Sequence, residues 1–330
     1  MTLAFTICSV NYLAQAKTLG DSLAKHCPEI KYVIGLTDQL ADKVIDKSQL
    51  PQAELLEVHQ LNIPNFKWMC QHYDITELNT AVKPYFIDYL FQRETEVNKL
   101  IYFDPDIIVY QPLTELSRWL DHYSIVVTPH ICSPVTDGYH PSEETHLNTG
   151  IFNLGFIALR RAEDTQRFVN WWKEKLAYEC KIDLANGLFV DQNWVNFAPY
   201  YFQNTIIIKN LGYNVAYWNL HERLLHHNNS QWTVQSLLSQ ENTPLIFFHY
   251  SGYQLAKPTV LSKYQNRFTF EQRPDVVPLF EDYAHQLHNN GNAYFAQFAC
   301  SYIRPKKVIR YRRVRKVLNY PFELLLKWIA

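Results

Sequence analysis

Residues 99–109 read KLIYFDPDIIV, an apolar segment interrupted by two carboxylates, and this segment decides the fold that we expect. Residues 99–103 have the apolar character of a short buried strand, and residues 107–109 resume extended character. Asp104 and Asp106 therefore follow the end of a buried strand. Because ligands of open α/β sheets bind beyond the carboxyl ends of strands, this position predicts a binding site.

Strand-like and helix-like segments alternate on both sides of this segment. The expected strands lie at residues 3–9, 31–37, 124–128, 150–159, 205–209 and 245–249. The expected helices lie at 12–26, 74–93, 163–179 and 192–198, with a long loop at 129–147. Asp74 with Glu77 predicts a capping box at the start of the second helix. The pattern indicates an α/β fold, a single mixed sheet flanked by helices over residues 1–263, with a helical C-terminal extension over residues 264–330.

The amino-acid composition is typical of an ordinary folded protein. The 330 residues are 47% hydrophobic and 15% aromatic, which excludes disordered and collagen-like classes. The six cysteines form no CxxC pair, so we expect free thiols in a reducing compartment. We find no signal peptide and no uncharged apolar run of about 20 residues that would span a membrane. The expected location is the cytoplasm.

The last segment of the chain is strongly basic. Residues 304–316 hold eight Lys and Arg and no acid, although the net charge of the chain is only -1. Apolar residues recur at helical spacing through 304–330, as in helices that lie on an anionic bilayer. Docking on the protein body is an alternative. We expect no nucleic acid, because Trp328 and the nearby leucines have no use on a phosphate backbone. Peripheral attachment to the cytoplasmic membrane face is therefore an open prediction.

The pair Asp104 and Asp106 is a candidate metal site. Two carboxylates separated by Pro105 can aim their oxygens at one hard cation, and Mg²⁺ and Mn²⁺ often share such ligands with substrate phosphates. A solvated turn with two acids is the alternative. The apolar residues on both sides leave little solvated surface, which favours the metal.

An ordered series of motifs resembles the nucleotide-diphospho-sugar glycosyltransferases of the GT-A (Rossmann-like) fold, and in particular glycosyltransferase family 8, a group of retaining enzymes. The resemblance covers residues 3–258. Its motifs are Val10-Asn11-Tyr12, Lys83, Asp104-Pro105-Asp106, NTGIFNLG at 148–155, Asp191-Gln192, His249-Tyr250-Ser251-Gly252 and Lys257-Pro258.

The resemblance implies which residues bind a metal ion and which basic residues lie near it. His249 would be the third ligand of Mn²⁺ or Mg²⁺ beside Asp104 and Asp106, and an imidazole nitrogen suits Mn²⁺. Lys83 and Lys257 would add positive charge near the donor phosphates. From the residues alone, His249 can also be a core histidine and Lys83 part of a solvated helix face.

Other motif residues would surround the sugar and the nucleotide. Asp191 and Gln192 would lie near the anomeric carbon, where they can stabilise positive charge and bind hydroxyls. Asp191 can also cap the helix at 192–198. Asn153 would contact the sugar, or satisfy a strand bulge. Asn11 and Tyr12 would meet the base and ribose, although the residues alone favour Asn11 as a helix N-cap.

These observations predict a metal-dependent glycosyltransferase. It would move a hexose from a nucleotide-diphosphate sugar, by default a UDP-sugar, to a hydroxyl of a glycan, lipid or protein acceptor, with retention of configuration. One alternative is a haloacid-dehalogenase-like phosphatase, which also carries two aspartates after an apolar strand. The other is a non-catalytic carbohydrate-binding relative, which would need no metal-dependent nucleotide binding.

Overall fold

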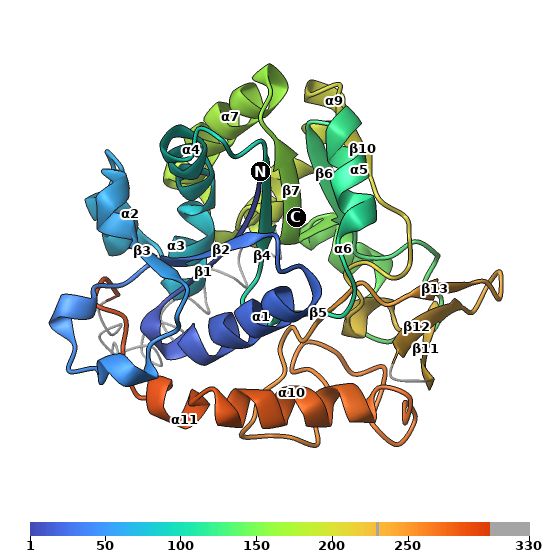
Figure 1. Cartoon of the computed structure of the whole chain (residues 1–330). Helices are drawn as coiled ribbons and strands as arrows, with labels where there is room; N and C mark the ends of the chain where they lie inside the picture. Colours follow the sequence, from blue (N-terminus) through green and yellow to red (C-terminus); the bar gives the residue numbers. More distant parts are fainter. Residues whose placement is uncertain (229–230, 304–330) are drawn as a thin grey trace, which may run out of the picture.

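A seven-stranded sheet forms the centre of the molecule (Figure 1), and the computed structural model describes residues 1–228 and 231–303 around it. The predicted membrane-contacting tail at 304–330 lies outside the described residues. The strand order is β10-β6-β7-β4-β1-β2-β3. These strands are β1 Thr2–Cys8, β2 Lys31–Leu36, β3 Glu54–Glu57, β4 Lys99–Phe103, β6 Ile125–Pro129, β7 Phe152–Arg160 and β10 Thr205–Ile207.

Strand direction makes this sheet mixed, as predicted. Strand β7 is antiparallel to both of its neighbours, and all other pairs in the sheet are parallel. Strand β4 lies between β1 and β7 and is buried along most of its length, which explains its continuous apolar sequence. Asp104 and Asp106 therefore follow the carboxyl end of a central strand.

Helices cover both faces of the sheet (Figure 1). Neighbouring residues of a strand point to opposite faces, so Phe5 joins the apolar cluster with α4 and α7, and Ala4 joins the cluster with α1 and α5. The helices are α1 Leu13–His26, α2 Phe66–His72, α3 Ile75–Ala81, α4 Lys83–Arg93, α5 Thr114–His122, α6 Glu143–Thr149, α7 Glu163–Glu179, α8 Gln192–Val195, α9 Ala198–Tyr201, α10 Val277–Asn289 and α11 Asn292–Phe295.

The single helix predicted over residues 74–93 is wrong, because the chain forms two helices there. The predicted capping box at Asp74 and Glu77 is present and starts α3. Pro84 has no N–H and its ring clashes with a continuing helical turn, so α3 ends at Ala81 and Lys83 starts α4. The break places Lys83 at the first residue of a helix, where its side chain can turn toward the sheet edge.

Other boundaries also differ from the prediction. The expected loop at 129–147 contains most of α6, which begins after the capping residue Ser142 and ends at Thr149. The expected helix at 192–198 is divided into α8 and α9, where Pro199 lies in the first turn of α9. The helical character expected from residue 264 begins only at α10. That helix packs with α1 in one apolar cluster along the lower edge of Figure 1.

Smaller sheets complete the described fold. A three-stranded antiparallel sheet, absent from the prediction, projects from one side (Figure 1), and two further pairs of short antiparallel strands are separate from the main sheet. Their strands are β5 Ile107–Val109, β8 Ile182–Asp183, β9 Leu188–Phe189, β11 Arg223–Asn228, β12 Gln231–Ser236, β13 Asn242–Pro244 and β14 Phe247–His249. All six cysteines are free thiols.

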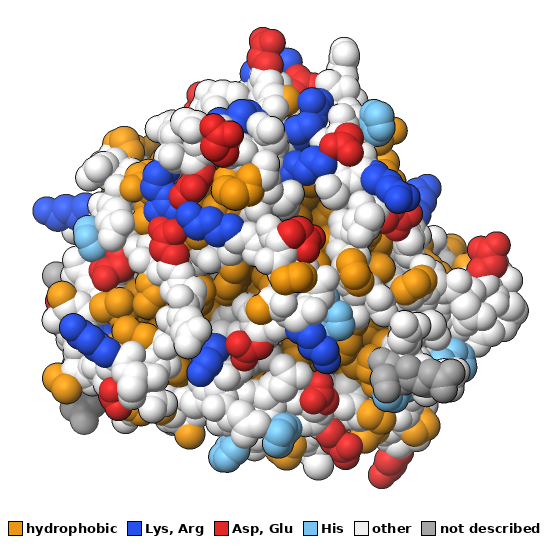
Figure 2. Space-filling view, in the orientation of Figure 1, with side chains coloured by type: hydrophobic (Ala, Val, Ile, Leu, Met, Phe, Trp, Pro, Cys, Tyr) orange, Lys and Arg blue, Asp and Glu red, His pale blue; other side chains and the backbone are white. Residues whose placement is uncertain are grey.

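The surface shows no separation of charge on the face in Figure 2, where acidic and basic side chains of the described residues are interspersed. Among the helices of the described residues, none has both the length and the apolar character needed to cross a membrane.

Candidate functional site

Asp104, Asp106 and His249 meet at the carboxyl edge of the sheet. After the turn at 104–106 the chain continues as β5, which pairs antiparallel with β14 so that His249 lies opposite Ile107. His249 Nε2 is 3.0 Å from Asp106 Oδ1 and 3.7 Å from Asp104 Oδ2. One ligand atom from each residue lies within 4.8 Å of the others. Among the described residues, these three side chains form one compact set of potential metal ligands.

A glycine makes room for the imidazole of His249. Gly155 lies in β7, and a Cβ atom there would overlap Cε1 of His249. The Gly155 carbonyl also accepts a hydrogen bond from the Asp104 amide at 2.7 Å. The ring of Trp218 packs edge-on against His249, with centroids 5.2 Å apart. The imidazole is therefore held from two sides while its Nε2 faces the carboxylates.

Burial and charge act against each other on these groups. Burial raises the pKa of Asp104, although the charges of Lys83 and His249 oppose that shift. Burial lowers the pKa of His249, but Asp106 and Asp104 outweigh it and the net shift is upward. Tyr102 donates a hydrogen bond of 2.6 Å to Asp104 Oδ1. Two close carboxylates thus share an environment that favours a neighbouring cation.

Lys83 and Asp191 form a buried ion pair beside this acidic site. Their side chains are each only 1% exposed, and Lys83 Nζ lies 2.5 Å from Asp191 Oδ2. The same Nζ donates to the Leu154 carbonyl at 2.8 Å and lies 4.2 Å from the ring centroid of Tyr102. Burial raises the pKa of Asp191, and Lys83 opposes that shift. Lys83 is therefore not part of a solvated helix face.

Asp191 occupies the N-cap position of α8, but its side chain makes no capping hydrogen bond. The helix-cap alternative for Asp191 is therefore wrong. Because the buried side chain of Asp191 does not cap α8, its carboxylate can serve another role.

The amides of Gln192 and Asn153 bind one another and the backbone. Gln192 Oε1 accepts from the Leu154 amide at 3.0 Å and from Asn153 Nδ2 at 3.3 Å, and Gln192 Nε2 donates to the Thr149 carbonyl at 2.9 Å. Asn153 Oδ1 accepts from the Gly155 amide at 3.1 Å. The two side chains fix the start of β7 under the site, and their contacts with a sugar stay a prediction.

The remaining motif residues are Asn11, Tyr12 and Lys257. Asn11 is not a helix N-cap as expected, because Tyr12 holds that position for α1, and Asn11 Oδ1 instead accepts a 2.5 Å hydrogen bond from Ser9 Oγ. Tyr12 is 45% exposed, and burial together with the charge of Asp106 raises its pKa to about 12. Lys257 is exposed. Within the described residues its side chain has no hydrogen bond or ion pair.

Three side chains of the site were absent from the sequence prediction: Tyr102, Trp218 and His130. Tyr102 had a signal, because residues two apart in a strand point to the same side and place it beside Asp104. His130 Nε2 lies 3.2 Å from Asn153 Nδ2, and its ring packs against Trp218 at 5.2 Å. No local sequence pattern marks His130 or Trp218 as a residue of the site.

Comparison with known proteins finds distant similarity. No protein-family model matches the chain. It is 25% identical over 258 residues to the uncharacterized protein YfnF of Bacillus subtilis strain 168, covering 77% of this chain and 83% of that protein. It is 21% identical over 252 residues to the uncharacterized protein YfnD of the same strain, covering 76% and 77%.

Three similar solved structures are glycosyltransferases. The galactosyltransferase LgtC, solved with donor and acceptor sugar analogs, is 15% identical with a TM-score of 0.49 over 88% of this chain and 96% of LgtC. The bifunctional glycosyltransferase WbbM is 14% identical with a TM-score of 0.48 over 88% and 51%. A glycosyltransferase that acts in glycosylation of the PBCV-1 major capsid is 10% identical with a TM-score of 0.43 over 78% and 95%.

Proposed function

We propose that this chain is a metal-dependent glycosyltransferase of the GT-A fold, related to glycosyltransferase family 8. It transfers a hexose from a nucleotide-diphosphate sugar, with UDP as the nucleotide, to an acceptor hydroxyl with retention of configuration. One observation carries this proposal. Asp104, Asp106 and His249 converge at the carboxyl edge of a central strand, next to the buried pair of Lys83 and Asp191.

The donor atoms fit Mn²⁺ or Mg²⁺. Two carboxylates and one imidazole nitrogen offer the oxygen and nitrogen ligands that these ions accept, and Mn²⁺ suits the mixed set best. Gly155 leaves the space that the imidazole occupies, and Tyr102 fixes one oxygen of Asp104. A cation bound there would neutralise the diphosphate of the donor and the charge of the departing nucleotide.

The buried ion pair of Lys83 and Asp191 suits the roles that we propose for these residues beside the transferred sugar. An ammonium group has three N–H donors, and Lys83 directs two of them to Asp191 and the Leu154 carbonyl. The charge of Lys83 would also add to that of the cation near the donor phosphates. Lys83 also holds Asp191 in one orientation, so that this carboxylate can stabilise positive charge at the anomeric carbon. Tyr12 and Asn11, at the end of β1, would meet the base and ribose.

As the acceptor we propose a hydroxyl of a glycan, a lipid-linked acceptor or a protein. The free thiols suit a reducing compartment such as the cytoplasm. The basic tail would hold the protein on anionic lipid. The full-length protein should sediment with vesicles of anionic phospholipid, and deletion of residues 304–330 should release it. Unchanged sedimentation of the deletion variant would refute the membrane contact.

A panel of nucleotide sugars tests the reaction. The protein in Mn²⁺ should hydrolyse or transfer from at least one of them, and Asp106→Ala should abolish this turnover. Asp42→Ala, which removes an exposed acid on the surface, should leave it unchanged. Release of phosphate from phosphomonoesters without turnover of any nucleotide sugar would favour the phosphatase. Sugar binding that needs no metal, again without turnover, would favour a carbohydrate-binding protein.

A further inference from the structure

The ring of His249 is oriented by the groups around it and not by a hydrogen bond of its own second nitrogen. A histidine that binds a metal usually donates from that nitrogen to a carbonyl or carboxylate, which fixes the ring. Nδ1 of His249 is buried and has no hydrogen-bond partner within residues 1–228 and 231–303. The 3.0 Å approach of its Nε2 to Asp106 therefore depends on the backbone of β14 and on the groups packed against the imidazole.

One turn supplies much of this support. Residues 214–219 lie between β10 and β11, and we call them the 214–219 turn. The His249 amide donates to the Val215 carbonyl at 2.8 Å, and the Val215 amide donates to the Phe247 carbonyl at 3.2 Å. Near the other end of the turn, Trp218 packs edge-on against the imidazole. A shift of this turn would therefore move both the backbone and the ring of His249.

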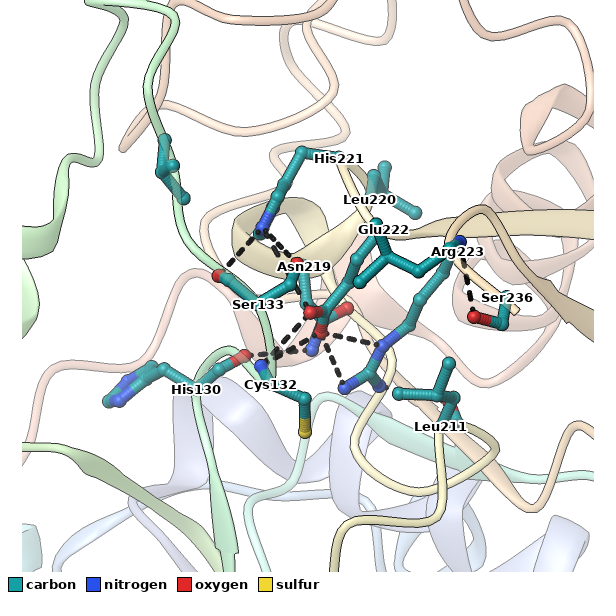
Figure 3. Close-up of polar contacts among 12 residues, drawn as sticks. His130, Cys132, Ser133, Leu211, Asn219, Leu220, His221, Glu222, Arg223 and Ser236 are labelled. Atoms are coloured by element: carbon teal, nitrogen blue, oxygen red, sulfur yellow. Dashed lines mark hydrogen bonds and ion pairs between the residues drawn. The ribbon is translucent and has the colours of Figure 1, made fainter. Parts of the chain in front are cut away.

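The side chain of Asn219 closes the 214–219 turn. Asn219 is fully buried, and its Oδ1 accepts a hydrogen bond from the Ala216 amide at 3.0 Å. Its Nδ2 donates to the Asn214 carbonyl at 2.9 Å. The same Nδ2 donates to the His130 carbonyl at 3.1 Å, in the segment that follows β6 (Figure 3). One carboxamide therefore fixes the turn internally and ties it to a segment distant in the sequence.

Further contacts join the segment after β6 to the residues that follow the turn (Figure 3). The Cys132 amide donates to both oxygens of Glu222, at 3.1 and 3.0 Å. Glu222 also pairs with buried Arg223 at 3.1 Å. Ser133 Oγ lies 3.3 Å from His221 Nε2. Because these contacts recur along both segments, we expect the segments to move together.

Asn214 joins the turn to the other side of His249. Its φ of 50° is left-handed, a conformation that asparagine adopts more readily than most residues. Its Nδ2 donates to Thr128 Oγ1 at 2.9 Å and to Asn153 Oδ1 at 3.1 Å. Asn153 Oδ1 also accepts from the amide of Gly155, the glycine that makes room for the imidazole. Asn214 therefore links the two structures that hold His249, the 214–219 turn and β7.

We propose that Asn214 and Asn219 are positioning residues of the candidate metal site and hold the imidazole of His249 against Asp106. Both asparagines are fully buried, and neither carries a charge that would act on the site directly. Buried hydrogen-bond networks rigidify the segments that they join. The use of His249 for a metal rests on the proposed function, whereas the position of its ring in the metal-free protein does not.

Binding of Mn²⁺ to the full-length protein, followed by electron paramagnetic resonance, tests this role. Asn214→Gly keeps the left-handed backbone accessible and removes both side-chain hydrogen bonds, so it should weaken Mn²⁺ binding about tenfold or more. Asn65→Gly is the matched control. It removes an amide that donates to the Ala177 carbonyl of α7 at 2.8 Å, so it should lower the unfolding free energy and leave the Mn²⁺ affinity unchanged.

Crystal structures of the parent and of Asn214→Gly without metal give a readout that does not depend on the proposed function. In the variant, His249 Nε2 should lie farther from Asp106 than the 3.0 Å of the parent. Asn219→Ala, at a helical position that suits alanine, serves as the second variant if Asn214→Gly does not fold.

The outcomes separate this proposal from the proposed function. An unmoved His249, an unchanged Mn²⁺ affinity in the variant, or an equal loss of affinity in Asn65→Gly would overturn the positioning role. A parent protein that binds no Mn²⁺ would contradict the proposed function, and the position of His249 in the variant crystal would then decide the role of the two asparagines.

Discussion

Replacement of Lys83 by Met should lower the free energy of unfolding, because Asp191 is then buried without its partner. Both side chains are 1% exposed, so the variant leaves a carboxylate without its partner in the interior. Removal of one member of a buried pair typically costs about 3–5 kcal/mol of unfolding free energy. In Lys83→Met with Asp191→Asn no charge is left behind, so the double variant should lose less. Urea denaturation of the parent, of the single variants Lys83→Met and Asp191→Asn, and of the double variant gives the coupling energy.

The free energy of unfolding of Lys83→Met should also depend on pH, in a direction that the structure predicts. Burial already raises the pKa of Asp191 against the opposition of Lys83, so loss of Lys83 raises it further. The folded variant then keeps a proton that the unfolded chain releases above about pH 4. Its stability is therefore greatest at low pH and falls by about 1.4 kcal/mol per pH unit until the pH passes the folded pKa.

The double variant with Asp191→Asn has no such carboxyl and should lack this slope. Denaturation at pH 5, 6 and 7 measures the difference between the two variants. A Lys83→Met protein within about 1 kcal/mol of the parent, or with the same pH dependence as the double variant, would refute the buried ion pair.

Two further substitutions probe the metal site. Gly155→Ala places a methyl group against His249 and should weaken Mn²⁺ binding, followed by electron paramagnetic resonance, by about tenfold or more, whereas Gly138→Ala, with no atom within 4 Å, should not. Equal affinities for the two variants would contradict this packing. Tyr102→Phe removes the hydrogen bond to Asp104 and should also lower Mn²⁺ affinity about tenfold, with the unfolding free energy reduced by about 1.5–3 kcal/mol. An unchanged Mn²⁺ affinity would show that Asp104 needs no such support.

Local patterns were sufficient for part of the fold and of the site. The apolar run before Asp104 predicted a buried strand with carboxylates at its end, and β4 has that form. The same reasoning missed the break at Val82, although Pro84 was a visible signal for it. The strands β11 to β13 are short and partly polar, so the period of two that marks a half-buried strand is weak there.

Contacts between distant segments were beyond local reasoning. His249 lies close to Asp106 because β14 pairs with β5, and no local sequence pattern near His249 predicts that pairing. The family resemblance was what predicted His249 as a third metal ligand. Lys83 meets Asp191 because α4 and α8 approach the same end of β7, a packing outcome that neither segment encodes alone.

The central claim is that a divalent cation binds between the two carboxylates and the distant imidazole. Diffraction from crystals soaked with Mn²⁺ and UDP, collected at a wavelength where manganese scatters anomalously, tests it most directly. We expect one anomalous peak in contact with Asp104, Asp106 and His249 and with the diphosphate of the nucleotide. Well-ordered side chains with no peak between them would contradict the account.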